Sequence, residues 1–188
     1  MIHIRVLGRF SVAGRRSREA NFQTARGHEL FAYLVLESGR MFHRARLAEQ
    51  FWAHLPENRA RKALSTEVWR IGTALREVGV DVDAALPRTH SAIGYRRQPD
   101  HRIDVDLLDA AVAVQRSIDP EAASDAQVAV VQAGVDAYCG DLLETSYSDW
   151  CLIWRETLRD KHIACVRFLM RAAMIRQLWS AALGHAQH

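Results

Sequence analysis

Residues 58–78, NRARKALSTEVWRIGTALREV, carry the pattern that decides the fold of the first half of the chain. Their main apolar positions recur at spacings of four, three, four and three, at Leu64, Val68, Ile71, Leu75 and Val78. At about 100° per residue, this spacing places them on one narrow stripe of an α-helix. We therefore predict a helix that buries this stripe and turns its opposite face outward.

The opposite face of this helix is polar and cationic, with one large exception. It carries Arg59, Lys62, Ser65, Thr66, Trp69, Thr73 and Arg76, with Arg70 at its edge. An indole in the middle of a polar face is costly to leave in water, so we expect Trp69 to contact something. A nucleic acid, the following hairpin and the second domain all remain open as its partner at this point.

The neighbouring segments predict a small sheet, two shorter helices and a hairpin around that helix. They are a strand over 2–6, a helix capped by Thr24 and ending near Ser38, a helix over 44–52, and hairpin strands over 86–88 and 93–97. A sheet, three helices and a terminal hairpin make a winged helix-turn-helix, whose third helix enters the major groove of DNA. The hairpin residues Arg88 and His90 would then reach the flanking backbone or groove.

From Asp104 onward the pattern predicts helices alone. Asp106 is the expected cap of the first, and Ser124 with Gln127 has the form of a capping box. A long helix is expected from 149 to 178, and a further one from Ser180, so we expect the helical domain to continue beyond His188. The predicted fold is an α+β winged helix-turn-helix domain, 1–97, followed by an all-α domain, 98–188.

Charge divides the chain at the same place. Residues 1–97 hold 17 Lys and Arg against 9 Asp and Glu, whereas residues 98–188 hold 8 against 13. A basic half suggests a polyanionic partner, although a basic domain docked on an acidic one would give the same balance. We predict a cytoplasmic protein without a membrane span, because no run of 18 apolar residues and no signal-peptide pattern is present.

Catalytic and metal-binding motifs are absent from the sequence. Its histidines and cysteines form neither HExxH nor CxxC, and no glycine-rich phosphate loop occurs. The carboxylates Asp104, Asp106 and Asp109 are explained by helix capping and a solvated face. We therefore expect neither an enzyme nor a bound metal or cofactor.

Several stretches together resemble the SARP-type regulators of bacteria. The first half carries RVLGRFSV (5–12), FAYLVLESGRMFHRARLAEQFW (31–52), RARKALSTEVWRIGTALRE (59–77) and IGYRR (93–97). These stretches resemble the OmpR-type winged helix of that family. The second half carries IDVDLLDAAV (103–112) and YCGDLLETSYSDWCLIWRETLRDKHIACVRFL (138–169), which resemble the bacterial transcriptional activator domain, BTAD.

The resemblance implies a DNA-binding transcriptional activator with tetratricopeptide-like (TPR-like) helix pairs in its second domain. It also implies contact with RNA polymerase and binding to double-stranded promoter DNA, often as a homodimer. The DNA-facing candidates from the face pattern and the resemblance together are Arg59, Arg61, Lys62, Ser65, Thr66, Trp69, Arg70, Thr73, Arg88 and His90.

Two departures from the family pattern favour an alternative function. Relatives tend to carry Leu-Arg-Arg where this chain has Ile71-Gly72-Thr73, so two cations are missing and a flexible glycine lies inside the helix, at a cost of about 1 kcal/mol. His43 also stands where the family often has a better helix cap. The alternative is a protein-interaction or signalling adaptor whose winged helix has weakened or lost DNA binding.

Overall fold

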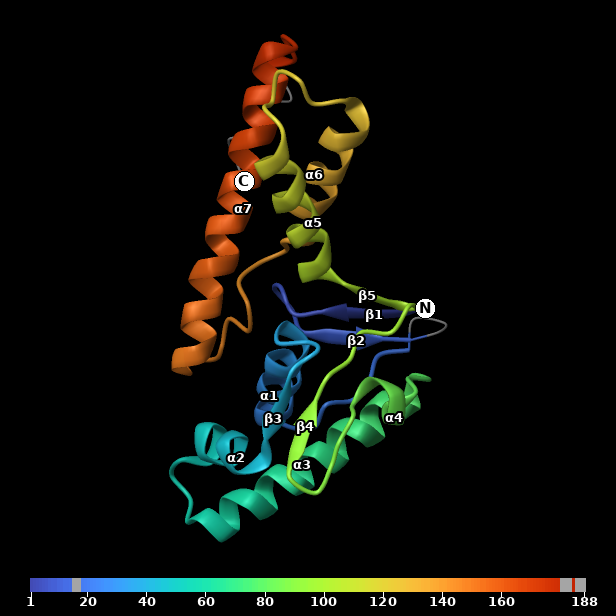
Figure 1. Ribbon diagram of the computed structural model, residues 1–188, viewed down its shortest axis with the longest axis vertical. Helices are drawn as coiled ribbons and strands as arrows, with labels where there is room; N and C mark the ends of the chain where they lie inside the picture. The colour runs from blue at the N-terminus through green and yellow to red at the C-terminus, as the bar shows by residue number, and fades with distance from the viewer. Residues whose placement is uncertain (15–17, 180–183, 185–188) are drawn as a thin grey trace. The chain divides into compact units, whose positions relative to one another are not determined.

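The computed structural model describes residues 1–14, 18–179 and 184. The chain forms two compact units, each built from two segments. Unit 1 comprises residues 1–4 and 10–102, and unit 2 comprises residues 5–9 and 103–188 (Figure 1). Small sheets and helices make up the first part of the chain, and the named elements after residue 103, among the described residues, are helices. The chain is therefore of mixed α+β class with mostly helical content.

The first part of the chain opens with the strand that the sequence predicts. Ile2 and Ile4 are buried and alternate with the exposed His3 and Arg5. The elements up to residue 103 are β1 (Ile2–Arg5), β2 (Ser11–Ala13), α1 (Ala25–Leu36), β3 (Met41–His43), α2 (Arg44–Trp52), α3 (Glu57–Glu77), α4 (Val82–Ala85), β4 (Ala92–Gly94) and β5 (His101–Ile103). β1 is the middle strand of a sheet with the order β2-β1-β5.

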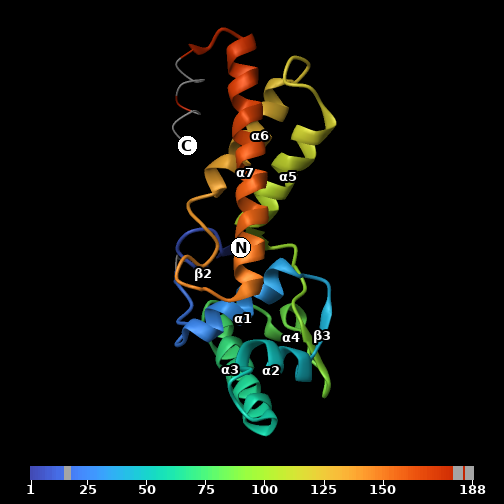
Figure 2. The same ribbon diagram turned by 90° about the vertical axis from the view of Figure 1, so that its left-hand side faces the viewer.

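Helix α1 is the central helix of unit 1. Its expected cap is confirmed, because the Thr24 hydroxyl accepts a hydrogen bond from the backbone N–H of Gly27 at 2.9 Å. Leu30, Phe31 and Leu34 are fully buried on it, as the apolar run predicts. Both α1 and α2 pack on α3, which positions that long helix at the margin of the unit (Figures 1 and 2).

The hairpin predicted from 86–88 and 93–97 is only partly right. Arg88 and Ile93 form one isolated bridge, whereas β4 pairs antiparallel with β3, with Phe42 opposite Ile93. Pro87 lacks a backbone N–H, so its segment cannot supply a full ladder. Its carbonyl instead accepts the backbone N–H of Gly94 at 3.1 Å. The connection between α4 and β4 is thus a tight turn beside a short two-stranded sheet.

Unit 2 is built around α5 (Asp104–Ser117), α6 (Asp125–Ala137) and α7 (Asp149–Ile175). The three helices pack against one another, with the long α7 running beside the other two (Figure 2). The capping box at the start of α6 is confirmed, with both of its reciprocal hydrogen bonds present. The helix expected from Ser180 lies outside the described residues.

The cap predicted at Asp106 is wrong, because α5 already begins at Asp104. Asp104 is the residue with the structural role. One carboxylate oxygen, Oδ2, accepts the backbone N–H groups of Val6 and Leu7, each at 2.8 Å. The other, Oδ1, accepts the N–H of Val105 at 2.8 Å. This carboxylate therefore holds the N-terminal segment 5–9 within unit 2.

A buried arginine fixes the loop that precedes α7. The guanidinium group of Arg155 donates to the carbonyl oxygens of Leu142, Leu143 and Ser146 at 2.8 to 3.1 Å. A buried cation is tolerated only where such acceptors surround it. This network gives a structural role to the GDLLE stretch (140–144), whose carbonyls supply two of the three acceptors.

Candidate nucleic-acid interface

The two faces of α3 are separated as the sequence predicts. Its inward stripe, from Leu64 to Val78, is buried. The outward residues include Trp69, whose side chain is 64% exposed. Six of the predicted residues on this face are exposed and two are half-buried; we call the eight the α3 face: Arg59, Arg61, Lys62, Ser65, Thr66, Trp69, Arg70 and Thr73.

The three hydroxyls of the α3 face are fixed by their own helix. Ser65, Thr66 and Thr73 each donate a hydrogen bond, of 3.0 to 3.1 Å, to the carbonyl oxygen four residues earlier. The side chains are thereby held close to the helix surface. The side chains around Trp69 therefore project little from the helix, which leaves room for a DNA duplex to approach.

Two of the four cations of the α3 face have carboxylate partners among the described residues, and two have none. Arg61 pairs with Glu57 at 2.6 Å, and Arg70 lies 3.4 Å from the buried Glu67. Within the part of the chain that the structure describes, the side chains of Arg59 and Lys62 have no ion-pair or hydrogen-bond partner. The Arg61–Glu57 pair is exposed on both sides and contributes little, so a phosphate group can displace it at small cost.

The turn between α4 and β4 carries the two remaining predicted residues. Arg88 and His90 are both exposed. Arg88 is directed toward α4, where it pairs with Asp83 at 3.1 Å. His90 lies instead at the tip of the turn, which the Thr89 hydroxyl closes by accepting the N–H of Ala92 at 2.9 Å.

Part of the predicted set converges on a pocket of about 530 Å³, which we call the α2–α3 pocket. It is lined by His43, Arg44, Ala45, Arg61, Leu64, Ser65, Thr89, His90 and Ser91. Arg61, Ser65 and His90 are thus brought together. The other predicted residues of the α3 face do not line it, and neither does Arg88.

Arg44 is the residue of this pocket that sequence reasoning missed. Its guanidinium group donates to the Ser65 hydroxyl at 2.9 Å, and its backbone N–H donates to the Ser91 carbonyl at 2.8 Å. It therefore joins α2, α3 and the turn before β4. The sequence shows only that Arg44 is the first residue of a predicted helix. Its two contacts, Ser65 and Ser91, are 21 and 47 residues further along the chain, so local patterns do not reveal them.

The start of α2 has the property expected of an anion-binding helix terminus. The prediction that His43 caps α2 poorly is confirmed, because its side chain makes no capping hydrogen bond. First-turn N–H groups without a side-chain cap favour a nearby anion, as does the helix dipole. Together with Arg44, Arg61 and His90, this terminus gives the pocket the character of a phosphate subsite.

Two further features of the described residues are the arrangement of possible metal ligands and the hydropathy of the helices. No cluster of three or more His, Cys, Asp or Glu side chains in the described ranges is arranged to hold a metal ion. None of the helices within those same ranges combines the length and hydropathy that crossing a bilayer requires.

Comparison with known proteins gives one informative structural likeness. No protein-family profile and no curated protein sequence matches the chain. The chain shares its fold with Mycobacterium tuberculosis EmbR, solved in complex with a low-affinity phosphopeptide, at a TM-score of 0.73 and 14% sequence identity. The alignment covers 99% of this chain and 58% of the EmbR chain. This likeness shows that the chain has the fold of the aligned part of EmbR, and that it spans somewhat more than half of the length of that chain.

Proposed function

We propose that this chain is a sequence-specific DNA-binding transcriptional regulator of the SARP type. Residues 1–97 act as a winged helix-turn-helix domain, with α3 in the major groove and the turn between α4 and β4 as the wing. The observation that carries the proposal is Trp69, which is 64% exposed in the middle of the cationic α3 face. A surface of this kind is unfavourable in water and suits a groove lined by sugars and phosphates.

The α2–α3 pocket adds a contact for the DNA backbone. Arg44 and Arg61 lie beside the uncapped start of α2, where the helix terminus also favours a phosphate oxygen. Arg59 and Lys62 are free for further phosphates along the same helix. The proposed interface therefore has cations at its margins and small hydroxyl side chains with Trp69 at its centre.

The helical part completes the proposal. Residues 98–188 act as a bacterial transcriptional activator domain with TPR-like helix pairs, and this domain contacts RNA polymerase. The protein works in the cytoplasm, as a homodimer on double-stranded promoter DNA. The SARP-type resemblance of both halves and the fold shared with EmbR support this assignment to a regulator.

The experiment is titration of the full chain with a duplex that it selects from a random library, over a range of salt concentrations. Specific binding should weaken steeply as salt rises, because each phosphate contact releases counterions. Arg59→Glu and Lys62→Glu should each reduce affinity and lower the slope of log K against log salt by about one. Both residues are exposed and free, so neither change disturbs a folded contact.

Arg116→Glu is the matched control. It makes the same change of net charge at an exposed arginine of α5, in unit 2 and outside the proposed DNA-binding domain. If it lowers DNA affinity as much as Lys62→Glu does, the effect is one of total charge and the docking face is wrong.

A protein-interaction adaptor is the second candidate, favoured by the ion pairs within the interface itself. Three of the predicted DNA contacts, Arg61, Arg70 and Arg88, already pair with carboxylates of this chain. Failure to enrich any duplex from the random library at low salt would favour this candidate over the regulator.

A further inference from the structure

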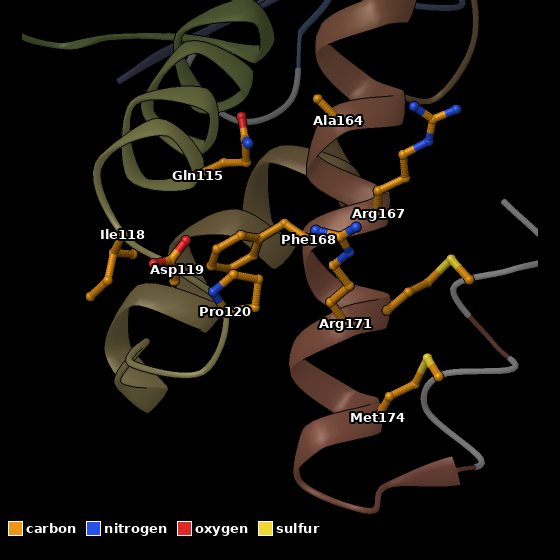
Figure 3. Close-up of a pocket in the computed structure, with 10 residues that line it drawn as sticks. Gln115, Ile118, Asp119, Pro120, Ala164, Arg167, Phe168, Arg171 and Met174 are labelled. Atoms are coloured by element: carbon orange, nitrogen blue, oxygen red, sulfur yellow. The ribbon is translucent and has the colours of Figure 1, made fainter.

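Unit 2 contains a second cavity, unrelated to the α3 face. It has a volume of about 550 Å³ and lies between the end of α5, the start of the α5–α6 connection and the second half of α7 (Figure 3). Cavities of about 300–1,000 Å³ are the size of sites for small organic molecules. We call it the α5–α7 pocket; it is lined by Gln115, Ile118, Asp119, Pro120, Ala164, Arg167, Phe168, Met170, Arg171 and Met174.

The lining of the α5–α7 pocket combines apolar side chains with charged and polar ones. Phe168 is a buried floor, only 3% exposed, whereas Met174 is 51% exposed. Ile118 and Pro120 from the α5–α6 connection are half-buried on the other side. Methionine side chains adapt their shape readily, and here they leave apolar surface in contact with water. These apolar side chains suit contact with an apolar ring or chain of a ligand.

The cations of this pocket are unlike the others on the same helix. Arg155, Arg159 and Lys161 of α7 and its C-cap residue Arg176 all have partners: loop carbonyls, Asp141, Asp109 and Asp125, respectively. Arg167 and Arg171 have no ion-pair or hydrogen-bond partner among the residues that the structure describes. These two are also the α7 cations that line the α5–α7 pocket.

The spacing of these two arginines makes an anion favourable. They are four residues apart on one helix, where like charges repel each other. A guanidinium group binds a carboxylate through two parallel hydrogen bonds, and an anion placed between the pair also relieves their repulsion. The third charge that lines the pocket, the exposed Asp119, leaves a net formal charge of one positive unit there. That balance matches a monoanion better than a doubly charged group.

We infer that the α5–α7 pocket binds a small amphipathic monoanion, a carboxylate attached to an apolar ring or chain. The carboxylate lies at Arg167 and Arg171, and the apolar part lies against Phe168, Met170 and Met174. Asp119 selects against a second negative charge on the ligand. This site is independent of DNA binding and stands even if the proposed function fails.

Methyl NMR of the full chain tests the site directly. The chain has four methionines, of which Met170 and Met174 line the pocket while Met1 and Met41 do not. With 13C-methyl methionine, titration with 1-naphthoate should shift the signals of Met170 and Met174 and leave those of Met1 and Met41 unchanged. 1-Naphthalenemethanol has the same ring without the charge and should bind about tenfold more weakly, because it loses the charge-assisted hydrogen bonds.

Two sets of variants with opposite expected effects separate binding from folding. The double variant Arg167→Gln/Arg171→Gln should lower naphthoate affinity to that of the alcohol, and Arg116→Gln should leave it unchanged. Asp119→Asn should raise naphthoate affinity, because it removes the opposing charge from the pocket. The site is overturned if the acid and the alcohol bind equally well, if the Met170 and Met174 signals do not move, or if the double variant binds naphthoate as well as the parent.

Discussion

The hydroxyl of Thr24 donates a hydrogen bond of 2.6 Å to Oε1 of Glu67, which joins the start of α1 to the middle of α3. Glu67 is 5% exposed, and its second oxygen lies 3.4 Å from a guanidinium nitrogen of Arg70. A buried carboxylate without partners is costly, so this arrangement both anchors α3 and positions one residue of the proposed interface. Glu67 thus connects α3 to the core, although the apolar periodicity of the sequence gives no sign that this residue is buried.

The first prediction follows from that contact. Thr24→Val removes the cap of α1 and the donor to Glu67, while keeping the shape of the side chain. We expect a loss of about 1–3 kcal/mol in the free energy of unfolding, measured with urea. Thr66→Val is the control, because its hydroxyl is exposed and donates only within its own helix; it should change stability by less than about 0.5 kcal/mol. Equal effects of the two changes would contradict a structural role for the Thr24–Glu67 pair.

The second prediction concerns Trp69. Because its indole is 64% exposed, Trp69→Ala should change the free energy of unfolding by less than about 0.5 kcal/mol. DNA affinity should nevertheless fall by about tenfold or more, as expected for an aromatic residue at the centre of an interface. Trp179→Ala, at an indole that is 60% exposed in unit 2, should leave DNA affinity unchanged. Filter binding or fluorescence anisotropy with the selected duplex provides the comparison.

The third prediction uses two helical glycines with opposite surroundings. A β-carbon at Gly72 would lie 3.4 Å from Cγ1 of Val82, an ordinary contact, so Gly72→Ala should stabilise the chain by about 0.5–1 kcal/mol. At Gly134 a β-carbon would lie 2.3 Å from that of Ala111, where α5 and α6 approach closely. Gly134→Ala should therefore destabilise the chain by about 1–3 kcal/mol. If the midpoint temperature of thermal unfolding shifts in the same direction for both variants, the surroundings described for Gly72 and Gly134 are wrong.

The fourth prediction is a dependence of stability on pH through Asp104. Burial raises the pKa of this carboxyl to about 6, although backbone N–H groups of Leu7, Val6 and Val105 favour its charged form. Folding therefore favours the neutral carboxyl, and this stabilisation is fully present below about pH 4 and is lost as pH rises to about 6.

Asp104→Asn isolates this effect, since all other groups titrate alike in both proteins. Between pH 4 and pH 7, the difference in unfolding free energy between parent and variant should change by up to about 3 kcal/mol, in the direction of a relatively less stable parent at high pH. A difference that stays constant over this range would exclude a raised pKa at Asp104.

Sequence reasoning succeeded where the signal is local. The buried stripe of α3, the Thr24 cap and the Ser124–Gln127 capping box depend on residues within a few turns of one another, and all three are confirmed. The outward position of Trp69 followed from the same periodicity. Its proposed contact with DNA stays a prediction.

Sequence reasoning failed where distant segments meet. The carboxylate of Asp104 contacts the amide of Val6 across 98 positions, so no local window could prefer it to Asp106 as the residue with the structural role. The pairing of β4 with β3 and the contacts of Arg44 are non-local for the same reason. The predicted site was therefore right about the exposed face of α3 but missed the pocket that joins this helix to two other segments.

The segment 5–9 and the carboxylate of Asp104 have a consequence for dissecting this protein. Because unit 2 draws on residues near the beginning of the chain, no single cut yields two fragments that each keep all their own parts. A fragment that starts at residue 98 would leave Asp104 without the Val6 and Leu7 amides and expose a buried acid to water. Exchange of helical domains between proteins of this architecture would therefore have to include the short N-terminal segment together with the helices.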